Sequence, residues 1–269
     1  MKILLIGDIV GRPGRVAIER FVIPLRDEHA IDLVIANCEN AAGGAGITPS
    51  TADELFRAGV DVLTSGNHVW RKKEVYELLK LDHRVLRPAN YSQDAPGSGS
   101  VVVEAANGVK VGVLNLMGRV FMEPLDCPFR TAEREIARLT LVTPVIIVDM
   151  HAEATSEKVA LGWFLDGRVS CVFGTHTHIP TADERILPKG TAFLTDVGMT
   201  GPYDSVIGRR VDQILPRFLT GIPSHSDVAE DNVQLRGLIV DVDPATGKAK
   251  SIERITRVFE GAVKYAAGD

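Results

Sequence analysis

The first two-thirds of the chain alternate between short apolar runs rich in β-branched residues and longer amphipathic stretches. This alternation is typical of β-α units built around a largely buried sheet. The predicted strands are residues 2–7, 32–36, 60–64, 145–149 and 170–173. The predicted helices are residues 14–28, 50–58, 72–80, 131–140 and 156–165. The pattern therefore indicates an α/β fold.

Two hairpins interrupt the alternation. Asn107-Gly108 joins the apolar runs 100–106 and 109–116, and this dipeptide is a strong signal for a tight β-turn. A turn-rich segment separates residues 232–242 from residues 249–259 and predicts a C-terminal hairpin. Antiparallel strands are thus added to the parallel ones. We expect a sheet that is mixed or split in two.

The organisation of the chain favours a single domain over residues 1–269. No internal repeat, long linker or shift in composition marks a boundary. Residues 216–231 contain two prolines and predict a long loop, within which His225 could reach a functional site as part of a lid.

Charge and cysteine content narrow the class of protein. The formal net charge of -5, from 30 basic and 35 acidic residues, lacks the basic excess typical of nucleic-acid binding. The three cysteines, Cys38, Cys127 and Cys171, form no CxxC pair and favour a reducing compartment. No apolar stretch approaches the roughly 18 residues of a membrane span. We expect a cytoplasmic protein without a membrane partner, and the sequence leaves homo-oligomerisation open.

Polar side chains follow each of the five predicted strands. Ligands of open α/β sheets collect beyond the carboxyl ends of the strands. Any one such residue is more often a helix cap or a loop residue, but burying the whole group without a cation would cost about 1–3 kcal/mol for each unsatisfied group. We therefore predict that a metal site lies where eight polar side chains converge: Asp8, Glu39, Asn40, Asn67, His68, His151, His176 and His178.

The His176-Thr177-His178 segment suggests how many ions bind. Residues at i and i+2 of an extended segment point to the same side, about 6–7 Å apart at their bases. This spacing suits two metal ions about 3.5–4 Å apart. A single zinc held by three histidines is the alternative, but it would leave Asp8, Glu39 and Asn67 without a role.

The ligand types and the charge of the site predict its metals and its substrate. Imidazole and amide ligands favour Fe, Mn, Zn or Co over Mg, and we expect iron or manganese first, in divalent or mixed-valence form. Two divalent ions, two carboxylates and a bridging hydroxide would leave a net charge of about +1. An anionic phosphoryl group fits such a site.

Several motifs resemble those of a known superfamily. Gly66-Asn67-His68 and Gly174-Thr175-His176-Thr177-His178 are similar to the GNH and GHTH blocks of the calcineurin-like metallophosphoesterases. Further blocks add a resemblance to the YmdB-type bacterial branch: Gly7-Asp8-Ile9-Val10-Gly11-Arg12, Asn37-Cys38-Glu39-Asn40, Asp149-Met150-His151 and Gly118-Arg119-Val120-Phe121-Met122. The ordered set spans nearly the whole chain. The resemblance implies a four-layer α/β/β/α sandwich of two mixed sheets with a dinuclear site at the strand ends.

The resemblance also implies the roles of the ligands. It makes Glu39 the bridging carboxylate, places Asp8 and His178 on one metal, and places Asn67, His151 and His176 on the other.

The sequence departs from the superfamily pattern at two positions, 10 and 69. Val10 replaces the usual histidine of Asp-x-His, so Asn40 must supply an oxygen ligand in its place. Val69 follows His68 where an acid is usual, so the carboxylate that commonly orients this histidine is absent.

The implied activity is that of a metal-dependent phosphodiesterase acting on 2',3'-cyclic nucleotides. A metal-bridged hydroxide would attack phosphorus in line, and His68 would bind the phosphoryl oxygen or protonate the leaving alkoxide. The product would be a 3'-nucleotide. The alternatives are a metal-dependent nucleotide-sensing regulatory protein with incidental hydrolysis, and a phosphomonoesterase or phosphoprotein phosphatase on the same fold.

Two aromatic residues lie near these motifs. Trp70 and Phe121 could each stack on a nucleobase, and packing in the core is the alternative for both.

Overall fold

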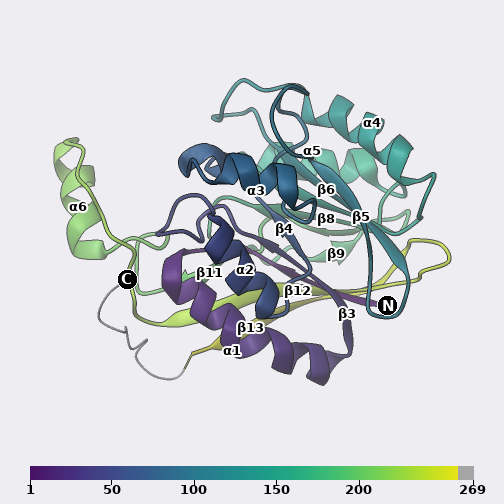
Figure 1. Cartoon of the computed structure of the whole chain (residues 1–269), viewed down its shortest axis with the longest axis horizontal. Helices are drawn as coiled ribbons and strands as arrows, with labels where there is room; N and C mark the ends of the chain where they lie inside the picture. Colours follow the sequence, from purple (N-terminus) through teal and green to yellow (C-terminus); the bar gives the residue numbers. More distant parts are fainter. Residues whose placement is uncertain (260–269) are drawn as a thin grey trace.

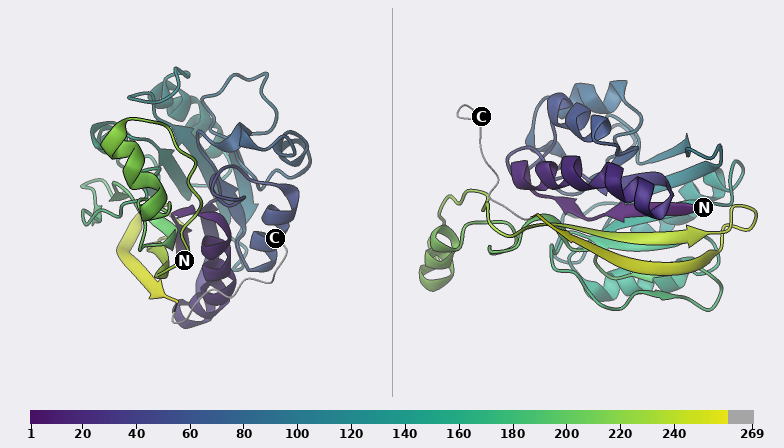
Figure 2. Two further views of the ribbon diagram at one scale, coloured as in Figure 1. Left: turned by 90° about the vertical axis from the view of Figure 1, so that its left-hand side faces the viewer. Right: turned by 90° about the horizontal axis from the view of Figure 1, so that it is seen from below.

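The computed structural model describes residues 1–259 and has four layers in the order helices, sheet, sheet, helices (Figures 1 and 2). This arrangement confirms the predicted α/β/β/α sandwich. The predicted domain 1–269 includes ten further residues that lie outside the described range. The helices of residues 1–259 are α1 (Gly11–His29), α2 (Pro49–Arg57), the short 3-10 helix η1 (Val69–Arg71), α3 (Val75–Leu81), α4 (Pro128–Leu139), α5 (Thr155–Leu165) and α6 (Val211–Thr220).

The first sheet combines parallel strands from the N-terminal half with the C-terminal hairpin. β1 pairs in parallel with β3 and antiparallel with β12, so the predicted parallel core and the predicted C-terminal hairpin share one sheet. Along the sheet the strands of residues 1–259 are β2 (Asp8–Ile9), β11 (Met199–Pro202), β12 (Val233–Val242), β1 (Lys2–Ile6), β3 (Ile31–Asn37) and β4 (Val62–Thr64), with β13 (Ala249–Val258) paired to β12.

The second sheet contains the other two predicted parallel strands. β6, β7 and β8 run parallel, and the Asn107-Gly108 turn joins β5 to β6 in the predicted antiparallel hairpin. In order, the strands that the described part of the chain contributes are β5 (Ser100–Glu104), β6 (Lys110–Met117), β7 (Ile146–His151), β8 (Cys171–Thr175), β10 (Ala192–Leu194) and β9 (Arg185–Ile186).

Three apolar layers hold the sandwich together. Alternate residues of a strand point to opposite faces, so Ile3 and Leu5 of β1 pack between the sheets while Leu4 and Ile6 pack beneath the helices α1 and α2. A third layer joins the second sheet to α4 and α5. Because both faces of each central strand are covered, these strands are apolar along their whole length, which explains the runs in the sequence.

Local signals explain where the helices begin. Thr48 is the N-cap of α2, where its side chain accepts a hydrogen bond from the backbone N–H of Thr51, and Pro49 occupies the first helical position as predicted. Pro128 likewise occupies the first helical position of α4. No helix within residues 1–259 has both the length and the apolar character that a membrane span requires.

The predicted division into two sheets is confirmed, with three of the predicted parallel strands in the first sheet and two in the second. One expectation needs correction. Residues 216–231 are not loop throughout, because α6 runs through Pro216 to Thr220. Proline removes one helical hydrogen bond, and in an exposed helix water can hydrate the freed carbonyl. Residues 211–226, called the α6 arm below, project from the body of the molecule (Figure 1).

Candidate metal centre

Eight polar side chains gather where the carboxyl ends of strands from both sheets meet. Each lies within or directly after the strand that leads into it, as the sequence pattern indicates. We call this set the rim: Asp8 in β2, Glu39 and Asn40 after β3, Asn67 and His68 after β4, His151 at the end of β7, and His176 and His178 after β8.

The rim contains two groups with the composition of metal sites. Ligand atoms of Glu39, His151 and His176 lie within 4.8 Å of one another, and so do those of Asp8, Glu39 and His178. Glu39 belongs to both groups. The resemblance groups these five residues in the same way, with Glu39 shared.

The two carboxylates of these groups, Asp8 and Glu39, are buried, so each oxygen needs a hydrogen-bond donor or a cation beside it. Oδ2 of Asp8 accepts the backbone N–H of His176 at 3.0 Å. Oδ1 of Asp8 is also buried and has no hydrogen-bond partner among the described residues. A buried carboxylate oxygen without a partner carries a free-energy penalty that a bound cation would remove. The residues present therefore fit divalent metal ions.

Hydrogen bonds fix which nitrogen of His178 and of His176 is available as a ligand. Nδ1 of His178 lies 2.9 Å from the carbonyl of Ile207, which can only accept, so its proton is on Nδ1 and the lone pair is on Nε2. Nε2 of His176 lies 3.1 Å from the carboxylate of Glu153, which leaves Nδ1 free. That atom lies 3.0 Å from Nε2 of His151, inside the first ligand group.

A buried relay orients His151. The hydroxyl of Thr175 donates to Asp149 at 2.7 Å, so it accepts from Nδ1–H of His151 at 2.9 Å. Nε2 of His151 thereby points toward Oε2 of Glu39 and Oδ1 of Asn67, each 3.1 Å away. Such partners of metal-binding histidines strengthen the ligand and hold its ring in place. Sequence reasoning missed Thr175 in this role.

Burial and the neighbouring charges shift the pKa values of the rim residues. Burial raises the pKa of Asp8, whereas for Glu39 the effect of burial is outweighed by His151 and His68, which hold its pKa well below the usual range. Burial lowers the pKa of His151, but Glu39 and Asp8 overcome it and raise that pKa to about 9. Burial and the charge of His151 lower the pKa of His176 to about 3. A cation held by Glu39 and His151 would replace the proton on His151.

His68 has partners in place of the carboxylate that the sequence lacks at position 69. Its Nδ1 lies 2.8 Å from Oδ1 of Asn40 and 3.4 Å from Oε1 of Glu39. The other end of the Asn40 amide lies 3.0 Å from Nε2 of His178. Asn40 thus links the proposed proton donor to a candidate ligand.

The backbone around the two histidines that follow β8 differs from the prediction. His176 and His178 have φ values of 98° and 67°, so the segment is left-handed at both and not extended. Each ring nevertheless joins a different ligand group. The carboxylate of Asp196 stabilises the intervening turn by accepting the N–H of Thr177 at 3.2 Å and its hydroxyl at 2.8 Å.

Asp196 itself depends on a buried lysine. Nζ of Lys158, on α5, donates to Oδ2 of Asp196 at 2.6 Å, and both side chains are almost fully buried. Neither residue was predicted, because each is an ordinary charged residue in the sequence until the fold places α5 beneath the loop after β8.

Space at the rim also depends on Gly66. A Cβ at this position would lie 2.1–2.4 Å from atoms of His151 and Glu39, which is closer than any side chain allows. The glycine of the Gly66-Asn67-His68 motif therefore gives the ligands room to converge.

The other residues considered from the sequence lie outside the rim. Trp70 packs against Tyr76 and Tyr91, with ring centroids 5.5 Å apart in both pairs, so core packing explains it. His225 is exposed on the α6 arm, where it pairs with Asp227 at 3.2 Å. Phe121 is exposed close to the rim.

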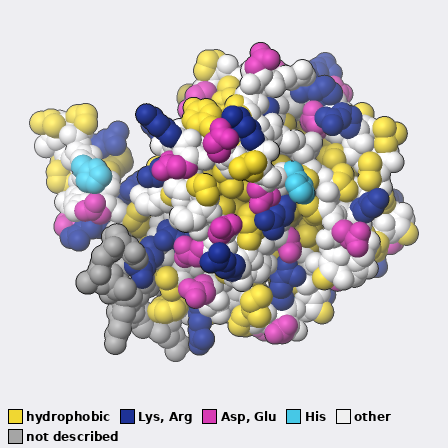
Figure 3. Space-filling view, viewed as in Figure 1, with side chains coloured by type: hydrophobic (Ala, Val, Ile, Leu, Met, Phe, Trp, Pro, Cys, Tyr) yellow, Lys and Arg dark blue, Asp and Glu magenta, His cyan; other side chains and the backbone are white. Residues whose placement is uncertain are grey.

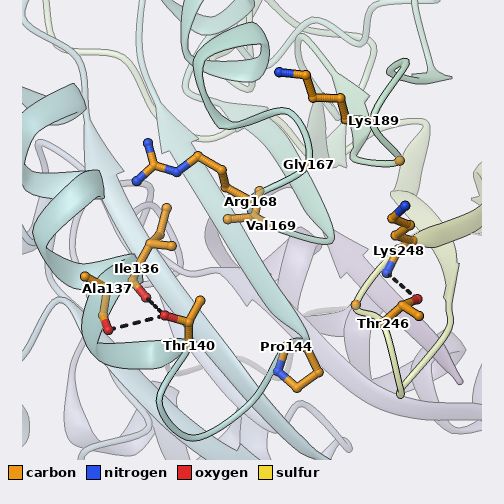
Figure 4. A pocket seen from close by; sticks show the side chains of 12 residues that line it. Ile136, Ala137, Thr140, Pro144, Gly167, Arg168, Val169, Lys189, Thr246 and Lys248 are labelled. Carbon is orange, nitrogen blue, oxygen red and sulfur yellow. Dashed lines mark hydrogen bonds between the residues drawn. The ribbon is translucent and has the colours of Figure 1, made fainter.

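A pocket of about 360 Å³ lies at the opposite end of the sheets and differs in kind. It is bounded by the segments that precede β7, β8 and β10 and by the turn between β12 and β13 (Figure 4). Its cationic residues, Arg168, Lys189 and Lys248, are exposed and spread around it without converging on one point. The rim thus differs from this pocket in bringing its charged groups together.

Comparison with known proteins agrees with this geometry. The family model described as YmdB-like protein matches residues 4–255. The 2',3'-cyclic-nucleotide 2'-phosphodiesterase of Bacillus subtilis is 49% identical over 255 residues, covering 95% of this chain and 96% of the relative.

Two solved structures share the whole fold. A hypothetical protein from Thermus thermophilus superposes with a TM-score of 0.90 at 43% identity, over 96% of this chain and 99% of that chain. A phosphatase from Mycoplasma pneumoniae also gives a TM-score of 0.90, at 37% identity, over 96% and 93% of the two chains. The match along nearly the full length, together with the rim, shows that this chain belongs to the YmdB-like protein family.

Proposed function

We propose that this protein is a dinuclear-metal phosphodiesterase that hydrolyses 2',3'-cyclic nucleotides to 3'-nucleotides. The observation that carries the proposal is the position of Glu39 in both ligand groups. The activity of the Bacillus subtilis relative, which is nearly half identical over the same length, supports the choice of substrate.

The ligands divide between two ion positions. Asp8, Asn40 and His178 would hold one ion, and Glu39 would be shared with the second. Asn67, His151 and His176 would complete the second position. Because imidazole and amide groups predominate, iron or manganese is the expected metal, ahead of zinc or cobalt.

The rim contributes binding, charge balance and proton transfer. When bound, the two cations supply a nucleophile near neutral pH and stabilise charge that develops on the phosphoryl oxygens. Asn40 orients His68 by accepting its Nδ1–H at Oδ1. As an imidazolium, His68 would donate the proton on Nε2 to the departing 2'-oxygen as the ring opens.

The cysteines support a cytoplasmic location for this activity. Cys38, Cys127 and Cys171 are free thiols, and the first and last are buried. Free thiols persist in reducing compartments.

Turnover by the metal-loaded protein tests the proposal. We expect wild-type protein to hydrolyse 2',3'-cyclic AMP at least about 100-fold faster than Asn67→Ala, which loses an oxygen ligand. Asn107→Ala, in the exposed turn between β5 and β6, is the matched control and keeps the wild-type rate. Equal rates for wild type and Asn67→Ala would overturn the enzyme proposal and favour a nucleotide sensor. Preference for p-nitrophenyl phosphate over its bis ester would instead indicate a phosphomonoesterase.

A further inference from the structure

One loop beside the rim has a shape that the metal chemistry does not explain. Residues 118–123 are the first part of the connection from β6 to α4 and border a pocket of about 350 Å³, within the size range of small-molecule sites. The pocket is lined by Asn67, Phe121, Met122, Glu123 and His176. Two candidate metal ligands and an aromatic ring therefore face the same space.

The base of this loop is tied directly to the metal centre. Gly118 donates its backbone N–H to the carbonyl of His151 at 2.9 Å. The carboxylate of Glu157, on α5, accepts the N–H groups of Arg119 at 3.1 Å and Val120 at 3.3 Å. A Cβ at Gly118 would lie 2.5 Å from that carboxylate and 2.6 Å from Cβ of Ala152, so this close approach requires glycine. The loop is thus held at a fixed position relative to His151.

Phe121, at the tip, combines two unfavourable properties. Its side chain is 89% exposed, and its backbone is left-handed with φ of 61°. A single exposed apolar side chain is common on protein surfaces. A bulky residue in the left-handed region is uncommon, and such strain clusters at ligand-binding sites. The left-handed backbone at Phe121 directs its ring outward, beside the candidate metal ligands Asn67 and His176.

We propose that Phe121 is the stacking platform for the nucleobase of the substrate. This inference rests on the proposed function, because it assigns a place to the part of a cyclic nucleotide that the cations do not hold. The phosphodiester lies at the rim and the base extends over the loop. Stacking on an aromatic face accepts every base and favours the larger purine rings.

The test compares substrates with and without a base. For Phe121→Ala we expect the KM for 2',3'-cyclic AMP to rise about 10-fold, a change within the range measured for base stacking. The KM for glycerol 1,2-cyclic phosphate, which has the same five-membered diester but no base, stays unchanged. Phe121→Tyr keeps the wild-type KM for both substrates. Leu141→Ala, which removes a comparably exposed apolar side chain (86%) after α4, is the matched control.

A second measurement follows the preference among bases. Wild-type protein is expected to show a lower KM for 2',3'-cyclic AMP than for 2',3'-cyclic CMP, and Phe121→Ala to reduce this difference. If Phe121→Ala raises the KM equally with and without a base, or changes neither, the stacking role is wrong while the phosphodiesterase stands. If the wild-type protein hydrolyses neither substrate, the proposed function itself fails.

Discussion

The rim and the α6 arm place their side chains in opposite environments. The rim buries Asp8, Glu39 and His151, and the charges of Glu39 and His151 compensate each other. The arm exposes apolar side chains, with Phe218 at 74% and Leu219 at 83% exposure, and its tip is visibly apolar in Figure 3. Residue polarity alone would assign the two regions the other way round.

The difference shows where the free energy of folding and of function is concentrated. In the rim, removing one partner leaves a buried charge uncompensated, which is costly. In the arm, the apolar side chains of Phe218 and Leu219 are already in water, so replacing them removes little favourable burial. Substitutions should therefore have large effects in the rim and small effects in the arm.

Glu39→Gln should give the largest effect. Glu39 belongs to both ligand groups, so losing its charge weakens both ion positions at once. We expect hydrolysis of 2',3'-cyclic AMP to fall by about 10⁴-fold, together with loss of bound metal. Glu19→Gln, an exposed glutamate of α1, is the control and should retain both. Full activity of Glu39→Gln would show that the shared carboxylate is not needed.

Lys158→Met should destabilise the protein itself. It leaves the charge of Asp196 buried without a cation beneath the turn that follows β8. We expect a cost of about 3–5 kcal/mol in the free energy of unfolding. Urea unfolding followed by circular dichroism measures this loss. The double variant Lys158→Met/Asp196→Leu should recover part of the stability, because no charge is then left unpaired. A loss below about 1 kcal/mol in the single variant would contradict this account.

His68→Ala separates proton donation from metal binding within the rim. We expect both metal ions to remain and kcat to fall by about 10²- to 10³-fold, the contribution of a general acid. Elemental analysis of the purified variant, alongside steady-state kinetics, distinguishes the two effects. Loss of metal from His68→Ala would show that it acts as a ligand instead.

The double variant Phe218→Ser/Leu219→Ser, in the α6 arm, should have the smallest effect on stability. Both side chains are already exposed, so we expect the free energy of unfolding to change by no more than about 0.5 kcal/mol. Urea unfolding provides the measurement under the conditions used for Lys158→Met. A destabilisation above about 2 kcal/mol would mean that these side chains are buried in solution.

The sequence predicted the rim because each of its members follows an apolar run that could be identified as a strand. The two sheets were harder to separate, since parallel strands of either sheet are equally apolar. The orientation of His151 through Thr175 and Asp149 could not be predicted, because it depends on contacts between β7 and β8. Helix α6 was missed because Pro216 indicates a loop.

The central claim is that the rim holds two cations that share Glu39. The most direct measurement is anomalous X-ray scattering from a crystal of the manganese-loaded protein. We predict two peaks on the order of 3.5–4 Å apart, one within the group Asp8, Glu39 and His178 and the other within the group Glu39, His151 and His176. A single peak, or no peak at the rim after loading, would contradict the account.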